Sequence, residues 1–282
     1  MADDVRPRLV RTLSGAGGVR LALREAGDPS SPPIVLLHGW AASALSWADQ
    51  LEDDALTARY RLIAADLRGH GESATPDDGY DDPAVWAGDV AALLEYAGRP
   101  AVLVGWSYGG LVVTDYLRVC GTAGVAGIVL VGAITEIGRG LPGGAVGPVM
   151  ARIMRPALSE DPAVAVPALT TLAERMTAEP GTAEQVRRRL ADSLRVPARV
   201  RAALFRRTAA SGDVLAAVDV PVLVVHGDAD EIISVAAGEY AAGKIPGARR
   251  RWFTGVGHMP LAERAAEFND DLRAFAGSVM DH

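Results

Sequence analysis

The fold of this protein is decided by residues 101–113, which read AVLVGWSYGGLVV. The first four residues are apolar without alternation, which predicts a strand buried on both faces of a parallel sheet. A Gly-x-Ser-x-Gly pattern follows, and an apolar helix begins at about Leu111. Glycines two residues before and two residues after Ser107 allow the strand and the helix to approach closely. We therefore expect a tight turn that exposes the Ser107 hydroxyl at the N-terminus of the helix.

The same alternation of strand and helix continues along the chain. Pro83 follows a predicted N-cap residue, and the helix that it begins keeps one apolar face until Gly98. A closing helix begins after Pro260. Strands that are apolar on both faces need helices on both sides, so the order predicts an α/β fold. The predicted strands are residues 34–37, 60–65, 101–104, 128–131 and 222–225, and one more strand ends near Phe253.

Residues 134–216 interrupt the alternation, because they contain no strand-like apolar run and are rich in Gly, Pro, Ala, Met and Arg. We interpret them as a helical cap inserted into a core domain formed by residues 1–133 and 217–282. Met150 and Met154 lie on short helices predicted within this cap. The alternative is that these methionines only form the cap's own hydrophobic core.

Composition restricts the classes of function. The 282 residues are 49% hydrophobic and 22% charged, which is typical of a folded globular protein. With 28 Lys and Arg against 35 Asp and Glu, the net charge of −7 disfavours nucleic acid and anionic membranes as partners. A single cysteine, Cys120, excludes an intrachain disulfide and a cysteine metal site. No apolar run approaches the roughly 20 residues of a membrane span.

The chemistry of activated serines indicates which other residues to look for. A hydroxyl is a weak nucleophile until a base takes its proton, and that base is itself oriented by an acid. His258 lies in a glycine-broken loop before the closing helix, whereas His38 and His226 end buried strands and are interpreted as loop histidines with satisfied hydrogen bonds. The acid is expected in the loop after the preceding strand, where Asp228 and Asp230 are both candidates.

Three further motifs accompany the serine turn: His38-Gly39-Trp40, the segment Asp66–Ser73 and the loop Gly227–Ile233. With them, the sequence from about Ser31 to Phe275 resembles the α/β-hydrolase superfamily, in the branch of cap-bearing esterases and cofactor-free haloperoxidases or perhydrolases. The chain order of serine, acid and histidine is also the order found there. The resemblance implies a mostly parallel eight-stranded sheet with helices on both faces and a helical cap inserted after the sixth strand.

The resemblance also assigns roles to individual residues. It implies a catalytic triad of Ser107, His258 and Asp230, with Asp230 rather than Asp228 as the acid. It implies that the backbone N–H groups of Trp40 and Tyr108 form the oxyanion hole. No cofactor and no metal are expected. The further candidates for the substrate pocket are Trp106, Met150, Met154 and Met259.

The expected function is therefore that of a serine hydrolase that cleaves a carboxylic ester, thioester or lactone in a small-molecule acyl substrate. Two alternatives remain open: transfer of the acyl group to peroxide or another acceptor by the same triad, and a non-catalytic hydrolase-like protein that binds a ligand. Ser107 excludes the haloalkane dehalogenases and epoxide hydrolases of the same superfamily, which carry aspartate at this position. Residues 1–6 lack a secretory signal, so a cytoplasmic protein is expected. No feature of the sequence predicts an oligomeric state.

Three other patterns are interpreted as structural. In the segment Asp66–Ser73, Asp66 and Arg68 are expected to pair or to cap the loop. Residues 138–143 spell G-x-G-x-x-G but do not connect a strand to a helix, so they are interpreted as a hinge of the cap. Residues 238–245 resemble a phosphate-binding loop, but Ile245 replaces the hydroxyl residue that would bind Mg²⁺.

Overall fold

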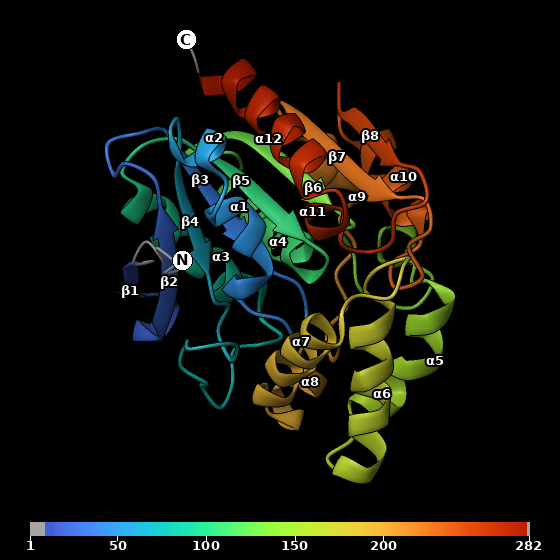
Figure 1. The fold of residues 1–282 in the computed structure, drawn as a ribbon. Helices are drawn as coiled ribbons and strands as arrows, with labels where there is room; N and C mark the ends of the chain where they lie inside the picture. Colours follow the sequence, from blue (N-terminus) through green and yellow to red (C-terminus); the bar gives the residue numbers. More distant parts are fainter. Residues whose placement is uncertain (1–8, 281–282) are drawn as a thin grey trace, which may run out of the picture.

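The computed structural model describes residues 9–280, so the predicted absence of a signal in residues 1–6 lies outside the described part. It contains one eight-stranded sheet in the order β1-β2-β4-β3-β5-β6-β7-β8, with helices packed around it (Figure 1). The strands are β1 (Leu9–Ser14), β2 (Arg20–Ala26), β3 (Pro33–Leu37), β4 (Arg61–Ala65), β5 (Ala101–Trp106), β6 (Val125–Val131), β7 (Val222–Gly227) and β8 (Arg249–Phe253).

The predicted α/β fold with a mostly parallel sheet is confirmed. Strands β3 to β8 pair in parallel, and only β2 runs antiparallel to its neighbours β1 and β4. The central strands β3, β5 and β7 are buried along their whole length. Their continuous apolar sequences are therefore explained by cover on both faces.

The helices of the core form two groups of contacts. Helices α1, α11 and α12 contact one another, whereas α4 contacts α3 and α9, and α9 contacts α10. This is the arrangement expected for layers on opposite faces of the sheet. The core helices are η1 (Ala16–Gly18), η2 (Ala44–Trp47), α1 (Ala48–Leu51), α2 (Asp54–Thr57), α3 (Pro83–Ala97), α4 (Tyr108–Cys120), α9 (Gly212–Ala216), α10 (Val235–Lys244), α11 (Pro260–Glu263) and α12 (Ala265–Met280).

Helix α3 shows how local sequence set its own boundaries. The Asp82 side chain accepts a hydrogen bond from the Ala84 N–H at 2.8 Å, and Pro83 occupies the first helical position. Gly98 ends the helix in the left-handed conformation, with φ of 78°. The prediction of one closing helix after Pro260 is wrong in one respect, because Arg264 leaves helical geometry and separates α11 from α12.

Between β6 and β7 the chain forms helices and only isolated β-bridges. Figure 1 shows α5 to α8 grouped beyond one end of the sheet. Short antiparallel bridges, Ile137 with Ala209 and Val146 with Ile233, tie this segment to itself and to the core. Helix α9 falls within the predicted cap but packs against α4 and α10. The helices before α9 are η3 (Pro142–Gly144), α5 (Pro148–Ala157), α6 (Pro162–Arg175), α7 (Ala183–Arg195) and α8 (Ala198–Ala203).

This topology brings distant parts of the chain to one edge of the sheet. Ser107 follows β5, Asp230 lies in the loop after β7, and His258 lies in the loop after β8. Because β5, β7 and β8 run in parallel, their carboxyl ends lie at the same edge, where open α/β sheets form crevices for ligands. Within the described residues, no helix is both long enough and apolar enough to cross a bilayer.

Candidate active site

Ser107 occupies a strained turn between β5 and α4. Its φ of 55° is in the left-handed region, which only one other described non-glycine residue, Ala41, also adopts. Such a conformation costs about 1–3 kcal/mol and persists only where the surroundings enforce it. Here the Ser107 N–H donates to the Val131 carbonyl at 2.9 Å, and its carbonyl accepts from the N–H of Gly110 at 3.0 Å.

Glycines let the backbone crowd around this turn. A Cβ at Gly109 would lie 2.4 Å from the Leu37 carbonyl oxygen, closer than any side chain can be placed. A Cβ at Gly39 would lie 2.9 Å from the Cβ of Ser107. The loop after β3 therefore lies directly beside the serine, and only glycine fits at these contacts.

Asp230 and His258 form the acid–imidazole contact. His258 Nδ1 lies 2.7 Å from Asp230 Oδ2, and both side chains are buried. Asp230 Oδ1 accepts hydrogen bonds from the N–H groups of Ile232 and Ile233 at 2.8 and 3.0 Å. Burial alone would raise the pKa of the Asp230 carboxyl, but His258 and the hydrogen bonds from His258 and His226 outweigh it and hold the pKa well below its usual value. Asp230 is therefore ionised near neutral pH.

The other ring nitrogen of His258 is available. Nε2 is buried, and none of the residues in the described range provides it with a hydrogen-bond partner. Ser107 and His258 line the same cavity, but the hydroxyl is not hydrogen-bonded to this nitrogen in the structure. Contacts of this kind are commonly long in ligand-free enzymes and tighten when substrate binds. Trp106 holds the His258 backbone in place, since its Nε1 donates to the His258 carbonyl at 2.9 Å.

The two aspartates that the sequence left open have different surroundings. Asp228 is exposed, and its Oδ1 accepts from the Gly255 N–H at 2.7 Å, so it stabilises the loop after β8. Asp230 alone of the two contacts His258.

The sequence interpretation of His226 as a loop histidine with all its hydrogen bonds satisfied is wrong. Its Nε2 lies 3.2 Å from Asp230 Oδ2, while its Nδ1 is buried and lacks a partner among the described residues. The sequence signal that could have indicated this contact is the position of His226 at the end of β7, four residues before Asp230.

The loop after β3 carries Trp40 and is held from several sides. The Ala41 N–H donates to His70 Nε2 at 3.3 Å, and the Ala41 carbonyl accepts from Ser193 Oγ of α7 at 2.8 Å. The Trp40 indole N–H donates to the Arg201 carbonyl of α8 at 3.3 Å. Residues of the predicted cap therefore help to fix the backbone beside Ser107.

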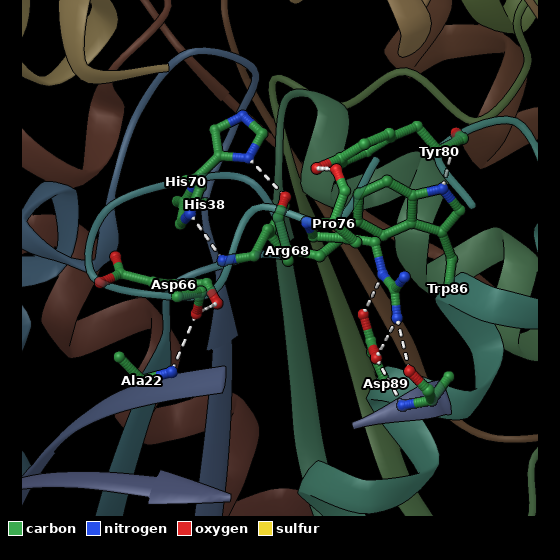
Figure 2. A network of polar contacts seen from close by, with 12 residues as sticks. Ala22, His38, Asp66, Arg68, His70, Pro76, Tyr80, Trp86 and Asp89 are labelled. Atoms are coloured by element: carbon green, nitrogen blue, oxygen red, sulfur yellow. Dashed lines mark hydrogen bonds and ion pairs between the residues drawn. The ribbon is translucent and has the colours of Figure 1, made fainter. Parts of the chain in front are cut away.

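The loop after β3 also contacts a second cluster of charged residues and histidines, which includes Asp66 and His70 and is drawn in Figure 2. Asp66 accepts from the N–H groups of Ala44 and Glu72 at 2.7 and 2.9 Å, so it caps the loop as expected. Arg68 does not pair with Asp66 but forms a buried ion pair with Asp89 of α3, at 2.6 and 2.7 Å.

The histidines of this cluster are kept neutral. Burial lowers the pKa of His38 to about 4. Burial also lowers the pKa of His70, to about 3, and the neighbouring His38 ring contributes to this shift. Both ring nitrogens of each histidine have partners, because Nδ1 donates to a backbone carbonyl and Nε2 accepts from a backbone N–H. These side chains are structural.

The cavity at Ser107 has a volume of about 400 Å³ and mostly apolar walls. Of the predicted pocket residues, Trp40, Trp106, Tyr108, Met150 and Met154 line it, whereas Met259 lines a separate small cavity of about 20 Å³. The apolar lining residues that sequence reasoning did not assign to the pocket include Ile134, Ile137, Val146, Leu172, Met176, Phe205, Ile232 and Ile233.

Glu136 also lines the cavity but is occupied by other contacts. Its buried carboxylate accepts from the N–H groups of Gly143 and Ser211 and from the Tyr240 hydroxyl, at 2.8–3.1 Å. It therefore ties together the two ends of the segment between β6 and β7. Across residues 9–280 there is no group of three or more His, Cys, Asp or Glu side chains that could hold a metal ion.

Residues 34–271 match the model of the alpha/beta hydrolase family. The chain is similar in structure to the esterase RhEst1 from Rhodococcus sp. ECU1013, with 45% identity, 96% of this chain and 99% of that chain covered, and a TM-score of 0.92. It is 32% identical to a non-heme chloroperoxidase of Streptomyces lividans, over 95% of this chain and 99% of the relative. It is 30% identical to a non-heme haloperoxidase of Rhodococcus erythropolis, over 94% of this chain and 99% of the relative.

Proposed function

The chain belongs to the alpha/beta hydrolase family and is an enzyme of its esterase and perhydrolase-like branch, and we propose that it cleaves a carboxylic ester, thioester or lactone through a Ser107–His258–Asp230 triad. The observation that carries the proposal is the buried, unpartnered Nε2 of His258 in the part of the chain described, in the cavity that Ser107 also lines. Acyl transfer by a serine requires a base with a free lone pair that can take the proton of the hydroxyl.

The first step forms an acyl-enzyme. The Ser107 hydroxyl gives its proton to His258 Nε2 while its oxygen attacks the substrate carbonyl, and the carbonyl oxygen becomes an oxyanion. Asp230, ionised and hydrogen-bonded to Nδ1, stabilises the imidazolium. When the tetrahedral intermediate collapses, the bond to the alcohol or thiol breaks, and His258 returns the proton to that leaving group.

The proposed donors to the oxyanion are the backbone N–H groups of Trp40 and Tyr108. Tyr108 is the first residue of α4, where an N–H has no acceptor within its own helix. The close approach of Gly39 to Ser107 brings the Trp40 backbone near the same point. A water then attacks the acyl-enzyme by the same sequence of proton transfers, which releases the acid and restores Ser107.

Covalent labelling tests the proposal. We expect a fluorophosphonate to modify Ser107 in the wild type, as detected by peptide mass spectrometry, and not to modify the Ser107→Ala variant. Turnover of a panel of esters of increasing acyl length, a thioester and a lactone should disappear in the same variant. Ser278→Ala, at an exposed serine of α12, is the matched control and should behave as the wild type. An unlabelled Ser107 with unchanged turnover in Ser107→Ala would refute the triad.

A second proposal concerns the acceptor of the acyl group. The similarity to a non-heme chloroperoxidase over nearly the whole chain favours peroxide as an alternative to water. Attack of hydrogen peroxide on the acyl-enzyme would release a peroxy acid and restore Ser107, with the proton passing through His258. Product analysis of one ester with and without peroxide distinguishes the two, since only perhydrolysis yields the peroxy acid.

A further inference from the structure

His226 contacts the carboxylate that orients the proposed base. It lies at the end of β7 and is fully buried. Its Nε2 lies 3.2 Å from Asp230 Oδ2 and 3.2 Å from the Ile233 carbonyl oxygen. Both of these oxygens are acceptors, so Nε2 carries the proton and donates it between them.

The carboxylate of Asp230 is surrounded by four donors. Two backbone N–H groups bind Oδ1, and the two imidazoles of His226 and His258 share Oδ2. The hydrogen bond from His258 Nδ1 is the shorter of the two, at 2.7 Å against 3.2 Å for His226 Nε2. His226 approaches the same oxygen from the strand side and limits the rotation of the carboxylate.

The His226 ring is itself held in one orientation. A Cβ placed on Gly238 of α10 would lie only 2.6 Å from His226 Nδ1, so the helix backbone packs against the ring. Trp252 of β8 also packs edge-on against the ring, with ring centroids 6.1 Å apart. With α10 and Trp252 against it, the ring cannot turn freely, and its Nδ1 has no partner among the described side chains and backbone.

From these contacts we propose that His226 is a positioning residue, which acts through Asp230 to hold His258 in the orientation needed for proton transfer. The inference rests on the proposed triad. In metal sites, partners that fix the orientation of a ligating histidine typically contribute 10- to 100-fold to function, and we expect an effect of this size from His226. His226 does not contact the substrate cavity and is given no proton-transfer role.

Two substitutions separate donation from packing. His226→Phe keeps a buried ring but removes the donor, and we expect kcat to fall by about 10- to 100-fold with KM little changed. His226→Gln restores an N–H donor on a chain of similar reach and should recover most of this loss. A merely structural role would lower the Tm of both variants and leave their kcat values alike.

A spectroscopic measurement tests the contact without turnover. The downfield proton signal of the His258 Nδ1–H···Asp230 hydrogen bond should weaken or move upfield in His226→Phe and return in His226→Gln. Gly238→Ala keeps His226 but displaces its ring, because the new Cβ would lie 2.6 Å from Nδ1. This variant should weaken the proton signal and lower kcat, as His226→Phe does. This second variant keeps the test valid should His226→Phe fail to fold.

The results would separate this inference from the proposed function. Folded His226→Phe with the kcat and the proton signal of the wild type would overturn the positioning role while the triad stands. A wild type that hydrolyses no ester and resists fluorophosphonate would instead overturn the proposed function, whereas the proton signal would still report whether His226 orders the Asp230–His258 pair.

Discussion

Two clusters of histidines and acids lie near the carboxyl ends of the parallel strands. They differ in how many of their polar atoms have hydrogen-bond partners. In the cluster of His38, Asp66, Arg68, His70 and Asp89, which we call the loop network, both nitrogens of each imidazole have backbone partners. Arg68 is paired with the Asp89 carboxylate (Figure 2). The loop network is dense in charge, yet it has no free base.

The second cluster, which we call the acid–histidine cluster, consists of His226, Asp230 and His258. It contains fewer charged groups, but His258 Nε2 is left without a partner among the described residues, in a cavity that Ser107 also lines. A buried nitrogen that forgoes a hydrogen bond costs free energy, which is typical of sites retained for function. Incomplete satisfaction beside a cavity therefore distinguishes the candidate site better than the density of charged residues does.

The largest expected effect is the loss of the base from the acid–histidine cluster. His258→Ala should reduce kcat/KM by about 10⁵-fold or more, because the serine then lacks a proton acceptor. Steady-state kinetics with an ester from the panel measures the effect, and circular dichroism checks the fold. Activity of His258→Ala within tenfold of the wild type would contradict the proposed role of His258 as the base.

A smaller loss is expected when the acid becomes neutral. Asp230→Asn should lower kcat by about 10⁴-fold, since an amide no longer stabilises the imidazolium and favours the wrong tautomer. Asp228→Asn is the matched control, because its carboxylate accepts from the Gly255 N–H in the loop after β8 and not from His258. Equal losses in both variants would mean that the loop, and not the contact with His258, controls activity.

Breaking the loop network should affect stability rather than chemistry. Arg68→Ala leaves Asp89 buried without its cation, and we expect the free energy of unfolding to fall by about 3–5 kcal/mol. Denaturant unfolding measures this loss, and kcat per fluorophosphonate-titrated site should change little. Arg24→Ala removes the more exposed ion pair with Glu72 and should cost under about 1 kcal/mol.

The last expected effect is on stability alone, and it is the pH dependence that one histidine of the loop network contributes. Burial lowers the pKa of His38 from 6.5 to about 4, so the unfolded chain binds the extra proton between these values. The contribution of neutral His38 is complete above pH 6.5 and is lost as the pH falls towards 4, by roughly 3 kcal/mol in all.

The His38→Gln variant isolates this term. Unfolding free energies measured from pH 7 to pH 4 should fall less steeply in the variant than in the wild type, because the remaining groups are common to both proteins. Parallel curves would show that His38 does not titrate differently in the folded and unfolded chains.

Much of the fold could be predicted from the sequence because its signals are local. The bounds of α3 follow from Asp82, Pro83 and Gly98, and the buried central strands follow from continuous apolar runs. Strands β1 and β2 were not located. β1 is the edge strand of the sheet and carries polar residues, and the apolar run of β2 is only three residues long, from Leu21 to Leu23, before charged residues follow. The break at Arg264 was also missed, because the apolar repeat continues across it.

The pocket was predictable only in part. Met150, Met154 and Met259 share the same residue type and were all predicted to line the pocket, yet only the first two line the cavity. The direction in which a side chain points after a loop such as 255–260 depends on how that loop packs, and no local pattern encodes it.

The amino-acid sequence by itself determined the strained serine turn, because glycine spacing and an apolar strand act over a few neighbouring residues. It also restricted the proposed base to His258 and the proposed acid to Asp228 or Asp230, of which the family resemblance favoured Asp230. Only the tertiary structure shows that Asp230, and not Asp228, contacts His258, and that His226 contacts the same carboxylate. The parallel pairing of β7 with β8 places His226 opposite Trp252 and brings the loops after both strands together. Contacts between residues 226, 230 and 258 thus arise from the register of two strands, a long-range property that no single stretch of sequence contains.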